Sequence, residues 1–465
     1  KKIMPLKIFN TLSGRKEAFK PRSAKKVDFY VCGPTVYDYS HLGHARTYIA
    51  FDIIVKYLRE KGYKVFYLQN ITDIDDKIIE RAKEKLTTPK LLAKTFEKEY
   101  LKDMKELKVD SVTEYARATD YIKEIISQIK HLSEKEYAYR IEDGIYYDIS
   151  KFRNYGKLSG RTSGQAEDAV SRIDEGKKKR NRGDFCLWRF SKMTEPSWES
   201  PWDWGRPGWH IEDTAIAEKH FGSQYDVHGG ARDLIFPHHE AEIAQMEGMS
   251  DKSPFVKYWM HSGFLTFRNQ KMAKSLGNFI LIRDFTKKYS ARLLRFLITK
   301  THYRSPIDYN EKLLSQARKE LDRIDEFANK LSQVKLIKMK PQQILKEAEK
   351  KFEEAMADDF NTPKAVAAIF ELVTKGNSLI AKNKLGGKEA KDILNFLKKA
   401  DEIFNFIFWK KPKETIPQLV LNLVRDREKY RKEGNWQKAD EARKKAQEMG
   451  YRIEDTKKGP KIKKI

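Results

Sequence analysis

The sequence predicts an α/β fold: an open parallel sheet split by an insertion, followed by an α-helical bundle and a small C-terminal module. Three observations predict it. Residues 27–72 read as strand, helix and strand, the pattern of a parallel pair joined by a crossover helix. Strand-like and turn-like segments return at 205–262, and the chain beyond 308 is almost entirely helical in pattern. The sheet is therefore expected in two halves.

The first half of the sheet begins with a βαβ unit. The apolar run VDFYVC at 27–32 predicts a buried strand, and the stretch from His41 onward has apolar residues at helical spacing until Gly62 ends it. The β-branched and aromatic run YKVFYLQNIT predicts the second strand. Ligands of parallel sheets bind beyond the carboxyl ends of the strands, so a site is expected near Cys32 and after Leu68.

The pattern changes between the two halves of the sheet. From Thr88 to about Ile129 it is helical, whereas 135–200 is polar and interrupted by glycine. Within this stretch GKLSGR and the charge run EGKKKRNRGD are expected to be exposed loops. The region is interpreted as an insertion into the fold.

The C-terminal third is expected to form an antiparallel helical bundle. Its amphipathic runs lie at 310–333, 341–356, 363–382 and 388–407. After KKPKETIP, a further helical segment and the basic tail GPKIKKI predict a small terminal module.

Composition limits the partners and the compartment. Lys and Arg outnumber Asp and Glu by 93 to 67, for a net charge of +26, which favours a polyanion such as nucleic acid. A lysine-rich genome bias is the competing explanation. Two cysteines in 465 residues fit a reducing compartment. With no apolar stretch that suits a signal peptide or a membrane span, a cytoplasmic protein with no membrane partner is expected.

His41, Gly43 and His44 stand where the first expected strand gives way to the helix. Free backbone N–H groups and the helix dipole attract phosphate there, and glycine permits a close approach. Imidazoles three residues apart share one face of the first turn, so both could donate to one triphosphate. Alone, the pattern HxxH also fits surface histidines or a metal pair.

Lys271 and Lys274 lie in QKMAKSLGN at 270–278, a polar stretch that ends in glycine. The sequence contains no GxxxxGK[ST] motif, so a P-loop is excluded and other groups must neutralise the phosphates. Taken alone, the two lysines would be a solvated charge pair.

Together, HLGH and KMAKS resemble the His-Ile-Gly-His and Lys-Met-Ser-Lys-Ser signatures of class I aminoacyl-tRNA synthetases, with Leu42 and Ala273 as mild departures. Further segments resemble, in order, those of the cysteinyl-tRNA synthetase family, over nearly the whole chain. They are YVCGPTVYDYSHLGHAR, NITDIDDKI, YGKLSGR, GRPGWHIE, HGGARDLIFPHHEAEIAQ, HYRSP, MADDFNTPKAVAAIFEL and GYRIEDTKKG. The resemblance implies ATP-dependent ligation of L-cysteine to tRNA(Cys) through a cysteinyl-adenylate, with release of AMP and pyrophosphate.

The resemblance also implies a class I Rossmann-like catalytic domain and a division of the chain. The expected parts are 1–122, the first half of the catalytic domain; 123–200, a connective insertion; 201–262, the second half; 263–313, the KMSKS loop and stem-contact region; 314–409, the helical bundle; and 410–465, an anticodon-binding module.

In the family, a zinc ion held by two cysteines, a histidine and a glutamate binds the thiolate of the substrate. Carried over by motif, the ligands are Cys32, Asp213, His238 and Glu242. His238 and Glu242, four residues apart, would face the same way on a helix. Asp213 is a departure, because GWHIED stands where the family has cysteine after GWHIE. Aspartate also binds zinc, but one soft ligand fewer makes a harder site, so zinc occupancy stays open.

Both cysteines have a simpler interpretation as small buried hydrophobic residues. For Cys32 the pair of His238 and Glu242 outweighs it, whereas Cys186, in the apolar run GDFCLWRF, is expected to be such a core residue.

The resemblance implies roles for the remaining site residues. Asp233 would lie near the substrate ammonium and Trp209 would form an aromatic wall; a turn-capping Asp and a core Trp are the alternatives. The implied amino-acid pocket consists of Gly33, Thr35, Thr72, Trp209 and Asp233. The implied catalytic residues, which position ATP and neutralise its charge, are His41, His44, Lys271 and Lys274. Magnesium is expected to arrive with ATP.

Two other classes of function stay open. A related ligase would pass activated cysteine to a small amine, but such an acceptor needs neither the bundle nor the GYRIEDT module. A non-catalytic RNA-binding paralogue is favoured only by Asp213 and opposed by the intact HLGH and KMAKS. The expected protein is a monomer that binds ATP, L-cysteine and tRNA(Cys), with Trp436 and Asp440 as candidates for reading the anticodon.

Overall fold

The computed structural model divides the chain into two compact units, Lys1–Phe408 and Trp409–Ile465, which are described separately. The described residues are 5–161, 178–267, 270–271, 279–335, 343–409, 417–456 and 459–464. Lys274 lies outside them, and for Lys271 only the backbone is described.

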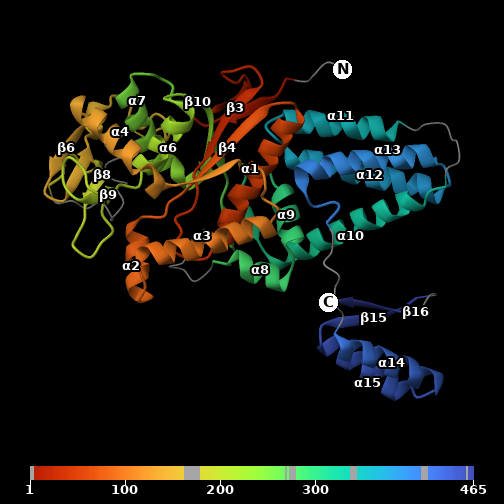
Figure 1. Cartoon of the computed structure of the whole chain (residues 1–465). Coiled ribbons are helices and arrows are strands. Elements are labelled where there is room, and N and C mark those ends of the chain that lie inside the picture. The colour runs from red at the N-terminus through yellow and green to blue at the C-terminus, as the bar shows by residue number, and fades with distance from the viewer. Residues whose placement is uncertain are drawn as a thin grey trace. The chain divides into compact units, whose positions relative to one another are not determined.

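The first unit is built around a sheet in which every pair of neighbouring strands is parallel (Figure 1). In spatial order the strands are β11 (Val256–Ser262), β10 (Tyr225–Ala231), β3 (Lys26–Val31), β4 (Lys64–Ile71) and β5 (Glu114–Arg117). Strands from both halves of the sequence pair directly, because β10 lies next to β3. The predicted α/β class with a split parallel sheet is confirmed.

Helix α1 (Leu42–Glu60) connects β3 to β4, as the sequence predicts. It is buried along most of its length, because it lies between the sheet and the helices α9 (Ala291–Thr299) and α13 (Gly387–Phe404). Asp52 of α1 and Arg295 of α9 form a fully buried ion pair. Removing one partner of such a pair costs about 3–5 kcal/mol, so this contact fixes the helices to the sheet.

The continuous helical pattern expected from Thr88 to Ile129 is wrong in one respect: β5 interrupts it. This four-residue strand pairs with β4 at the edge of the sheet. Four residues are too few to show a period of two, so the helical pattern on either side conceals the strand. The helices around it are α2 (Asp76–Glu84), α3 (Pro89–Glu106), η1 (Ala118–Tyr121) and α4 (Ile122–Glu134).

The insertion is more ordered than its polar sequence suggests. It contains an antiparallel sheet whose strands are β6 (Ala138–Ile141), β7 (Gly144–Tyr147), β8 (Phe185–Phe190) and β9 (Gly205–Pro207), with the short helix η2 (Ile149–Lys151) after β7. Cys186 of β8 is buried with Tyr139 and Tyr146, as predicted for a core cysteine.

GKLSGR is not the exposed loop that its glycines suggest. Leu158 is 5% exposed, and the backbone N–H groups of Leu158 and Ser159 donate to the Glu240 carboxylate at 3.1 and 2.9 Å. The charge run is also anchored where it is described, because Asp184 is 1% exposed and accepts the Ile149 N–H. Long-range contacts thus override the local turn signals.

Several helices that follow the insertion surround the carboxyl edge of the sheet. They are α6 (Ile211–Phe221), η4 (Arg232–Leu234), the π-helical segment η5 (Ile235–His239), α7 (Glu240–Ser250) and α8 (Ile282–Lys288). A small sheet in the order β13 (Gln270–Lys271), β12 (Leu265–Phe267) and β14 (Ile307–Tyr309) follows, and the hairpin β1 (Lys7–Asn10) and β2 (Arg15–Ala18) precedes the fold.

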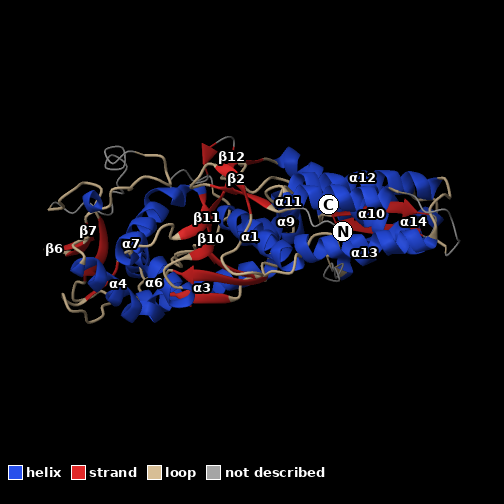
Figure 2. Cartoon of the chain, turned by 90° about the horizontal axis from the view of Figure 1, so that it is seen from above, coloured by secondary structure: helices blue, strands red, loops and turns tan. Residues whose placement is uncertain are grey.

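The helical bundle matches its predicted ranges to within three residues at each end. Its helices, α13 included, pack side by side next to α9 (Figure 2). The others are α10 (Glu311–Gln333), α11 (Ile344–Ala357) and α12 (Thr362–Ala381). Buried positions such as Leu314, Ala317, Leu321 and Ile324 recur at helical spacing, which is why the pattern was readable.

The second unit contains α14 (Gln418–Lys432), α15 (Trp436–Glu448) and an antiparallel hairpin of β15 (Tyr451–Thr456) and β16 (Gly459–Lys464). The basic tail is thus a paired strand and not an extension of a helical module. Val424, Ala446 and Ile453 form the hydrophobic core of this second unit. In the described part of the chain no helix combines the length and the apolar character that crossing a membrane requires.

Candidate metal centre and active site

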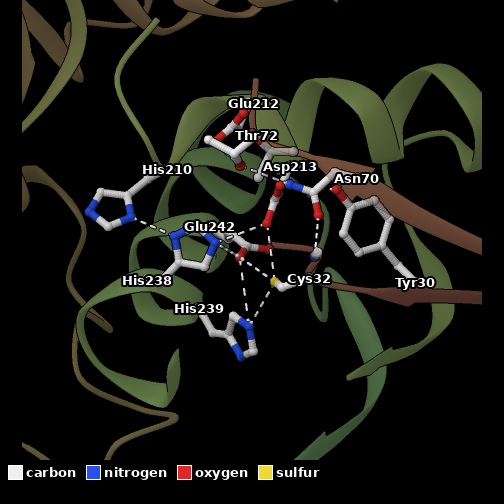
Figure 3. Close-up of polar contacts among 12 residues, drawn as sticks. Tyr30, Cys32, Asn70, Thr72, His210, Glu212, Asp213, His238, His239 and Glu242 are labelled. Atoms are coloured by element: carbon white, nitrogen blue, oxygen red, sulfur yellow. Dashed lines mark hydrogen bonds and ion pairs between the residues drawn. The ribbon is translucent and has the colours of Figure 1, made fainter. Parts of the chain in front are cut away.

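A buried pocket lies beyond the carboxyl ends of β3 and β10 (Figure 3). Cys32 directly follows β3, and its N–H donates to the Gly229 carbonyl of β10 at 3.0 Å. Asp213 comes from the first turn of α6, His238 from η5 and Glu242 from α7. The fold therefore brings the predicted ligands together, each at most 4% exposed.

The donor atoms of these side chains converge. Cys32 Sγ is 3.1 Å from Asp213 Oδ2, and His238 Nε2 is 2.9 Å from the same oxygen. His238 Nε2 also lies 3.2 Å from Glu242 Oε1, as the i, i+4 spacing predicts. Metal–ligand bonds of about 2.0–2.3 Å in a tetrahedral site separate the ligand atoms by about 3.3–3.8 Å, and these four donor atoms are close enough together to share one ion.

A second observation at the pocket points to a cation. Glu242 is fully buried, and its Oε2 has no hydrogen-bond partner among the described residues. A buried carboxylate oxygen without a partner is costly, and a divalent cation would remove that cost.

His228 and His239 are pocket residues that the sequence analysis missed. Their Nε2 atoms lie 3.2 and 3.1 Å from Cys32 Sγ. The available signals were the HGG that contains His228 and the doublet of adjacent histidines in FPHHE, of which only the first was selected. Cys32, His228, His239 and Glu242 form a second group of donors within 4.8 Å of one another.

Burial controls the charge states in the pocket. Burial, then Asp213 and Glu242, raises the pKa of the Cys32 thiol well above its usual value, and burial with Asp213 does the same to the pKa of Glu242. Burial lowers the pKa of His228 and His239, so both imidazoles are neutral. Metal ligands must be deprotonated, and a cation between the two acids would favour their ionised forms.

A chain of hydrogen bonds forms one wall beside the pocket. The Gly33 N–H donates to Asn70 Oδ1 at 2.5 Å, the Asn70 amide donates to Thr72 Oγ1 at 3.3 Å, and the Thr72 hydroxyl donates to Glu212 Oε1 at 2.8 Å. Thr72 also forms a parallel β-bridge with Thr35. The structure thus connects the predicted residues Gly33, Thr35 and Thr72 through Asn70 and Glu212, which sequence reasoning did not select.

Glycine is required at position 33. A Cβ there would lie 1.7 Å from the carbonyl oxygen of Asn70, so any other residue would push β4 away from the end of β3. The close approach keeps Cys32 and the Asn70 chain in fixed relation.

An open cavity lies next to the metal pocket, on the side of Trp209 and His210. Thr35, Arg206, Trp209 and His210 are among the residues that line it. Trp209 is 40% exposed and stacks on His238 with ring centroids 4.3 Å apart. Asp233 instead lies exposed in η4 and is not among the residues that line this cavity, so its contact with a substrate ammonium stays a prediction.

The HLGH turn forms a capping box at the start of α1. Gly43 N–H donates to His41 Nδ1 at 3.0 Å, His41 N–H donates to His44 Nδ1 at 3.2 Å, and the two rings stack 4.0 Å apart. Leu42 N–H donates to the Ile280 carbonyl. The expectation of free N–H groups at this helix start is therefore wrong, and phosphate binding here would depend on the imidazoles.

Gly43 has a structural role in the turn, and its expected role in letting a phosphate approach stays a prediction. A Cβ at this position would lie 2.7 Å from Cε1 of His41, so the glycine makes room for the His41 ring.

The segments next to the two predicted nucleotide motifs, HLGH and KMAKS, contact each other. The N–H of Ile282, at the start of α8, donates to the Ser40 carbonyl at 2.9 Å, and His41 forms an antiparallel bridge with Leu281. The chain that directly follows KMAKS is thus attached to the turn before α1. The roles of Lys271 and Lys274 stay predictions, because their side chains lie outside the described residues.

Comparison with known proteins agrees with this arrangement. The family model of the "tRNA synthetases class I (C) catalytic domain" matches residues 18–319, and that of the DALR domain matches 351–408. Among solved structures, a methionyl-tRNA synthetase from Mycobacterium tuberculosis, in complex with methionyl-adenylate, has a TM-score of 0.60 at 14% identity. That likeness covers 81% of this chain and 89% of that one, and at such low identity it shows the fold alone.

Relatives of much higher identity extend over the whole sequence. The cysteine–tRNA ligase of Thermococcus gammatolerans is 44% identical over 484 aligned positions, covering 99% of this chain and 100% of that protein. The cysteine–tRNA ligase of Carboxydothermus hydrogenoformans is 43% identical over 467 positions, with 99% and 100% covered. The chain therefore belongs to the cysteine–tRNA ligase family of class I aminoacyl-tRNA synthetases.

Proposed function

We propose that this protein ligates L-cysteine to tRNA(Cys) in two ATP-dependent steps. The carboxylate of cysteine attacks the α-phosphate of ATP, forming cysteinyl-adenylate and releasing pyrophosphate. A ribose hydroxyl at the tRNA terminus then attacks the acyl carbon and AMP leaves. One observation carries the proposal: Cys32, Asp213, His238 and Glu242 converge beside the cavity that Trp209 and Thr35 line.

Zinc is the proposed resident ion of the pocket, held at Cys32 and Glu242 with Asp213 and His238 as the ligands that the motifs predict. Glu242 Oε2, which has no hydrogen-bond partner among the described residues and lies 3.5 Å from His228 Nδ1, and the mixed donor set of sulfur, nitrogen and oxygen support it. When bound, the ion supplies a coordination position that favours the thiolate of cysteine over the hydroxyl of serine. Shape alone separates such near-isosteres by only about 1–3 kcal/mol.

The residues of the chain position the reactants and neutralise charge. His41, His44, Lys271 and Lys274 are proposed to hold the phosphates of ATP, which arrives with magnesium. Trp209 would cover the bound amino acid and Asp233 would meet its ammonium group. The first step needs no protein general base, because the attacking carboxylate is already ionised and is held in line with the α-phosphate. In the second step, the proton of the attacking hydroxyl passes to the phosphate oxygen of the leaving AMP.

The decisive experiment combines metal analysis with cysteine-dependent ATP–pyrophosphate exchange on purified protein. We expect about one zinc per chain and exchange with cysteine but not with serine at equal concentration. Exchange with serine approaching that with cysteine would refute the role of the metal in selection. Exchange without transfer to tRNA would instead indicate the small-amine ligase.

The second unit is proposed to bind the anticodon, which corresponds to the predicted module 410–465. Trp436 is 62% exposed, Asp440 is also exposed, and the Arg431 guanidinium lies 5.9 Å from the Trp436 ring centroid. Exposed aromatic rings beside arginine are suited to stacking on unpaired bases. Trp436→Ala should raise the KM for tRNA and leave ATP–pyrophosphate exchange unchanged, whereas equal loss of both activities would contradict the assignment.

Binding of tRNA should depend strongly on salt, because the phosphates release counterions. We expect the KM for tRNA to rise by about ten-fold or more between 50 and 200 mM salt. We also propose a cytoplasmic monomer, since every pocket donor described comes from one chain and the proposed substrates are cytoplasmic. Analytical ultracentrifugation would check the oligomeric state.

A further inference from the structure

Residues 40–42 and 280–282 form a short antiparallel pairing at the HLGH turn. The Leu42 N–H donates to a carbonyl of the second segment and the Ile282 N–H donates to a carbonyl of the first, both at 2.9 Å. His41 lies between these two bonds and forms the bridge of the pairing. The backbone position of His41 therefore depends on the segment that follows KMAKS.

Arg283 extends this pairing with a side-chain contact. It is the second residue of α8, and its guanidinium carbon lies 4.0 Å from the centroid of the Tyr39 ring. Tyr39 directly precedes one paired segment and Arg283 directly follows the other. A guanidinium is attracted to the face of an aromatic ring and packs flat against it. The contact therefore joins the two segments at the end of their pairing.

The Tyr39 ring is held by α3 as well. Phe96 meets it edge to face, with centroids 5.2 Å apart and ring planes at 89°. Phe96 is 8% exposed, so Tyr39 rests on a buried part of α3. Glu99 of the same helix lies 3.9 Å from the Arg283 guanidinium, a long and partly exposed ion pair that adds little. The ring is therefore the main partner of Arg283 on this side.

Helix α8 has its own anchors in the core. Ile282 is 0% exposed and Phe285 is 2% exposed. The Arg283 side chain is 31% exposed and is not part of that core. Replacing it should therefore remove the contact with Tyr39 and leave α8 folded.

Both groups of proposed phosphate ligands are attached to this junction. His41 and His44 belong to the turn, whereas Lys271 and Lys274 precede the paired segment by several residues. In-line attack requires the α-phosphate to be held accurately, and a displacement of about 1 Å can cost about 10²-fold in rate. A contact that fixes one motif relative to the other should therefore affect the rate of adenylate formation more than the binding of cysteine.

We propose that Arg283 is a positioning residue for adenylate formation. Stacked on Tyr39, it keeps the segment after KMAKS in register with the HLGH turn, and so aligns the imidazoles with the lysines around the triphosphate. It acts through these groups and not by touching the reacting atoms. The inference rests on the proposed function and adds the residues that align its two nucleotide motifs.

Arg283→Ala and Lys288→Ala test the proposal as a matched pair on one helix. Lys288 also lies over a tyrosine ring, that of Tyr289 at 5.0 Å, and it pairs with Glu311. Cysteine-dependent ATP–pyrophosphate exchange is measured on variants whose circular dichroism matches the parent. We expect Arg283→Ala to lower the kcat of exchange about 10-fold with an unchanged KM for cysteine, and Lys288→Ala to change neither. Equal losses in the two variants would overturn the proposal.

Variants of Tyr39 test the other side of the contact. Tyr39→Leu should lower the kcat of exchange about as much as Arg283→Ala, and Tyr39→Phe, which keeps the aromatic face, should recover most of that loss. The double variant of Arg283→Ala and Tyr39→Leu should lose no more than either single one, because both changes remove the same contact. Fully additive losses would overturn the proposal.

The second step separates positioning from a general loss of structure. In Arg283→Ala, transfer of cysteine from preformed cysteinyl-adenylate to tRNA should keep its parental rate, because the triphosphate has already reacted. Equal damage to exchange and transfer, or a change confined to the KM for cysteine, would overturn the positioning role and leave the proposed function intact. Absence of cysteine-dependent exchange in the parent protein would refute both.

Discussion

The HLGH turn and the metal pocket stand at the same edge of one sheet but are built in different ways. In the turn, His41, Gly43 and His44 form hydrogen bonds with one another within four residues, and residues 280–282, which follow KMAKS, bond to the same turn. The pocket takes Cys32, Asp213, His228 and Glu242 from distant parts of the chain. A local site tolerates change elsewhere, whereas the pocket depends on the register of the whole sheet. Substitutions should therefore affect the two sites separately.

The largest effect is expected from Cys32→Ala. This variant lacks the thiol that belongs to both groups of candidate metal donors. Because a metal site contributes several kcal/mol to catalysis, cysteine-dependent ATP–pyrophosphate exchange should fall by about 10³-fold or more. Binding of ATP alone, measured by calorimetry, should not change. Loss of ATP binding in a folded variant would show that the two sites are coupled.

His44→Asn changes the HLGH turn and leaves the metal pocket unchanged. The Asn side chain retains an acceptor for the His41 N–H but removes the imidazole, so the rate constant of exchange should fall about 10²-fold to 10³-fold. Zinc content and the KM for cysteine should stay at parental values. A drop in bound zinc would contradict a separate nucleotide site.

Asp213→Cys tests how much the aspartate weakens the pocket. A second soft ligand should raise zinc affinity by about 10-fold or more, and the cobalt-substituted protein should gain thiolate charge-transfer absorption. Asp213→Asn is the control, because it keeps the shape and adds no sulfur. If both variants bind zinc like the parent, residue 213 is not a metal ligand.

The smallest effect concerns a carboxyl group outside both sites. Burial, then Glu106, raises the pKa of Asp103 to about 7, and its Oδ2 has no partner among the described residues. The folded state therefore holds this proton more tightly than the unfolded chain, whose pKa is about 3.9, and stability falls as pH rises from about 4 to 7. Asp103→Asn should raise the melting temperature by about 2 °C at pH 8 and leave it unchanged at pH 4.

The sequence predicted two kinds of feature: elements whose buried residues recur over many positions, and sites whose residues match a known motif. The long helices of the bundle and α1 could be predicted because their buried residues recur at helical spacing. Strand β5 could not, since four residues carry too little pattern, and Leu158 is buried because it packs into a core formed by distant elements and its N–H donates to Glu240. Local patterns contain no information about such distant partners.

The same limit applies to the sites. The motifs identified Cys32, His238 and Glu242, but nothing near His239 in the sequence shows that its ring would point at Cys32. Asn70 and Glu212 were missed for the same reason, because their importance comes from partners on other elements. The free N–H groups expected at the start of α1 were wrong because histidine side chains cap them.

The chain of hydrogen bonds from Gly33 to Glu212 can run in only one direction. The Gly33 N–H at one end can only donate, so Asn70 Oδ1 must accept there and the Asn70 amide must donate to Thr72 Oγ1. At the other end, the Thr72 hydroxyl donates to Glu212 Oε1. Replacing Asn70 by aspartate would remove the donor that Thr72 requires and break the sequence of bonds in its middle. The hydrogen-bond chain beside the metal pocket thus has a fixed polarity between Gly33 and Thr72.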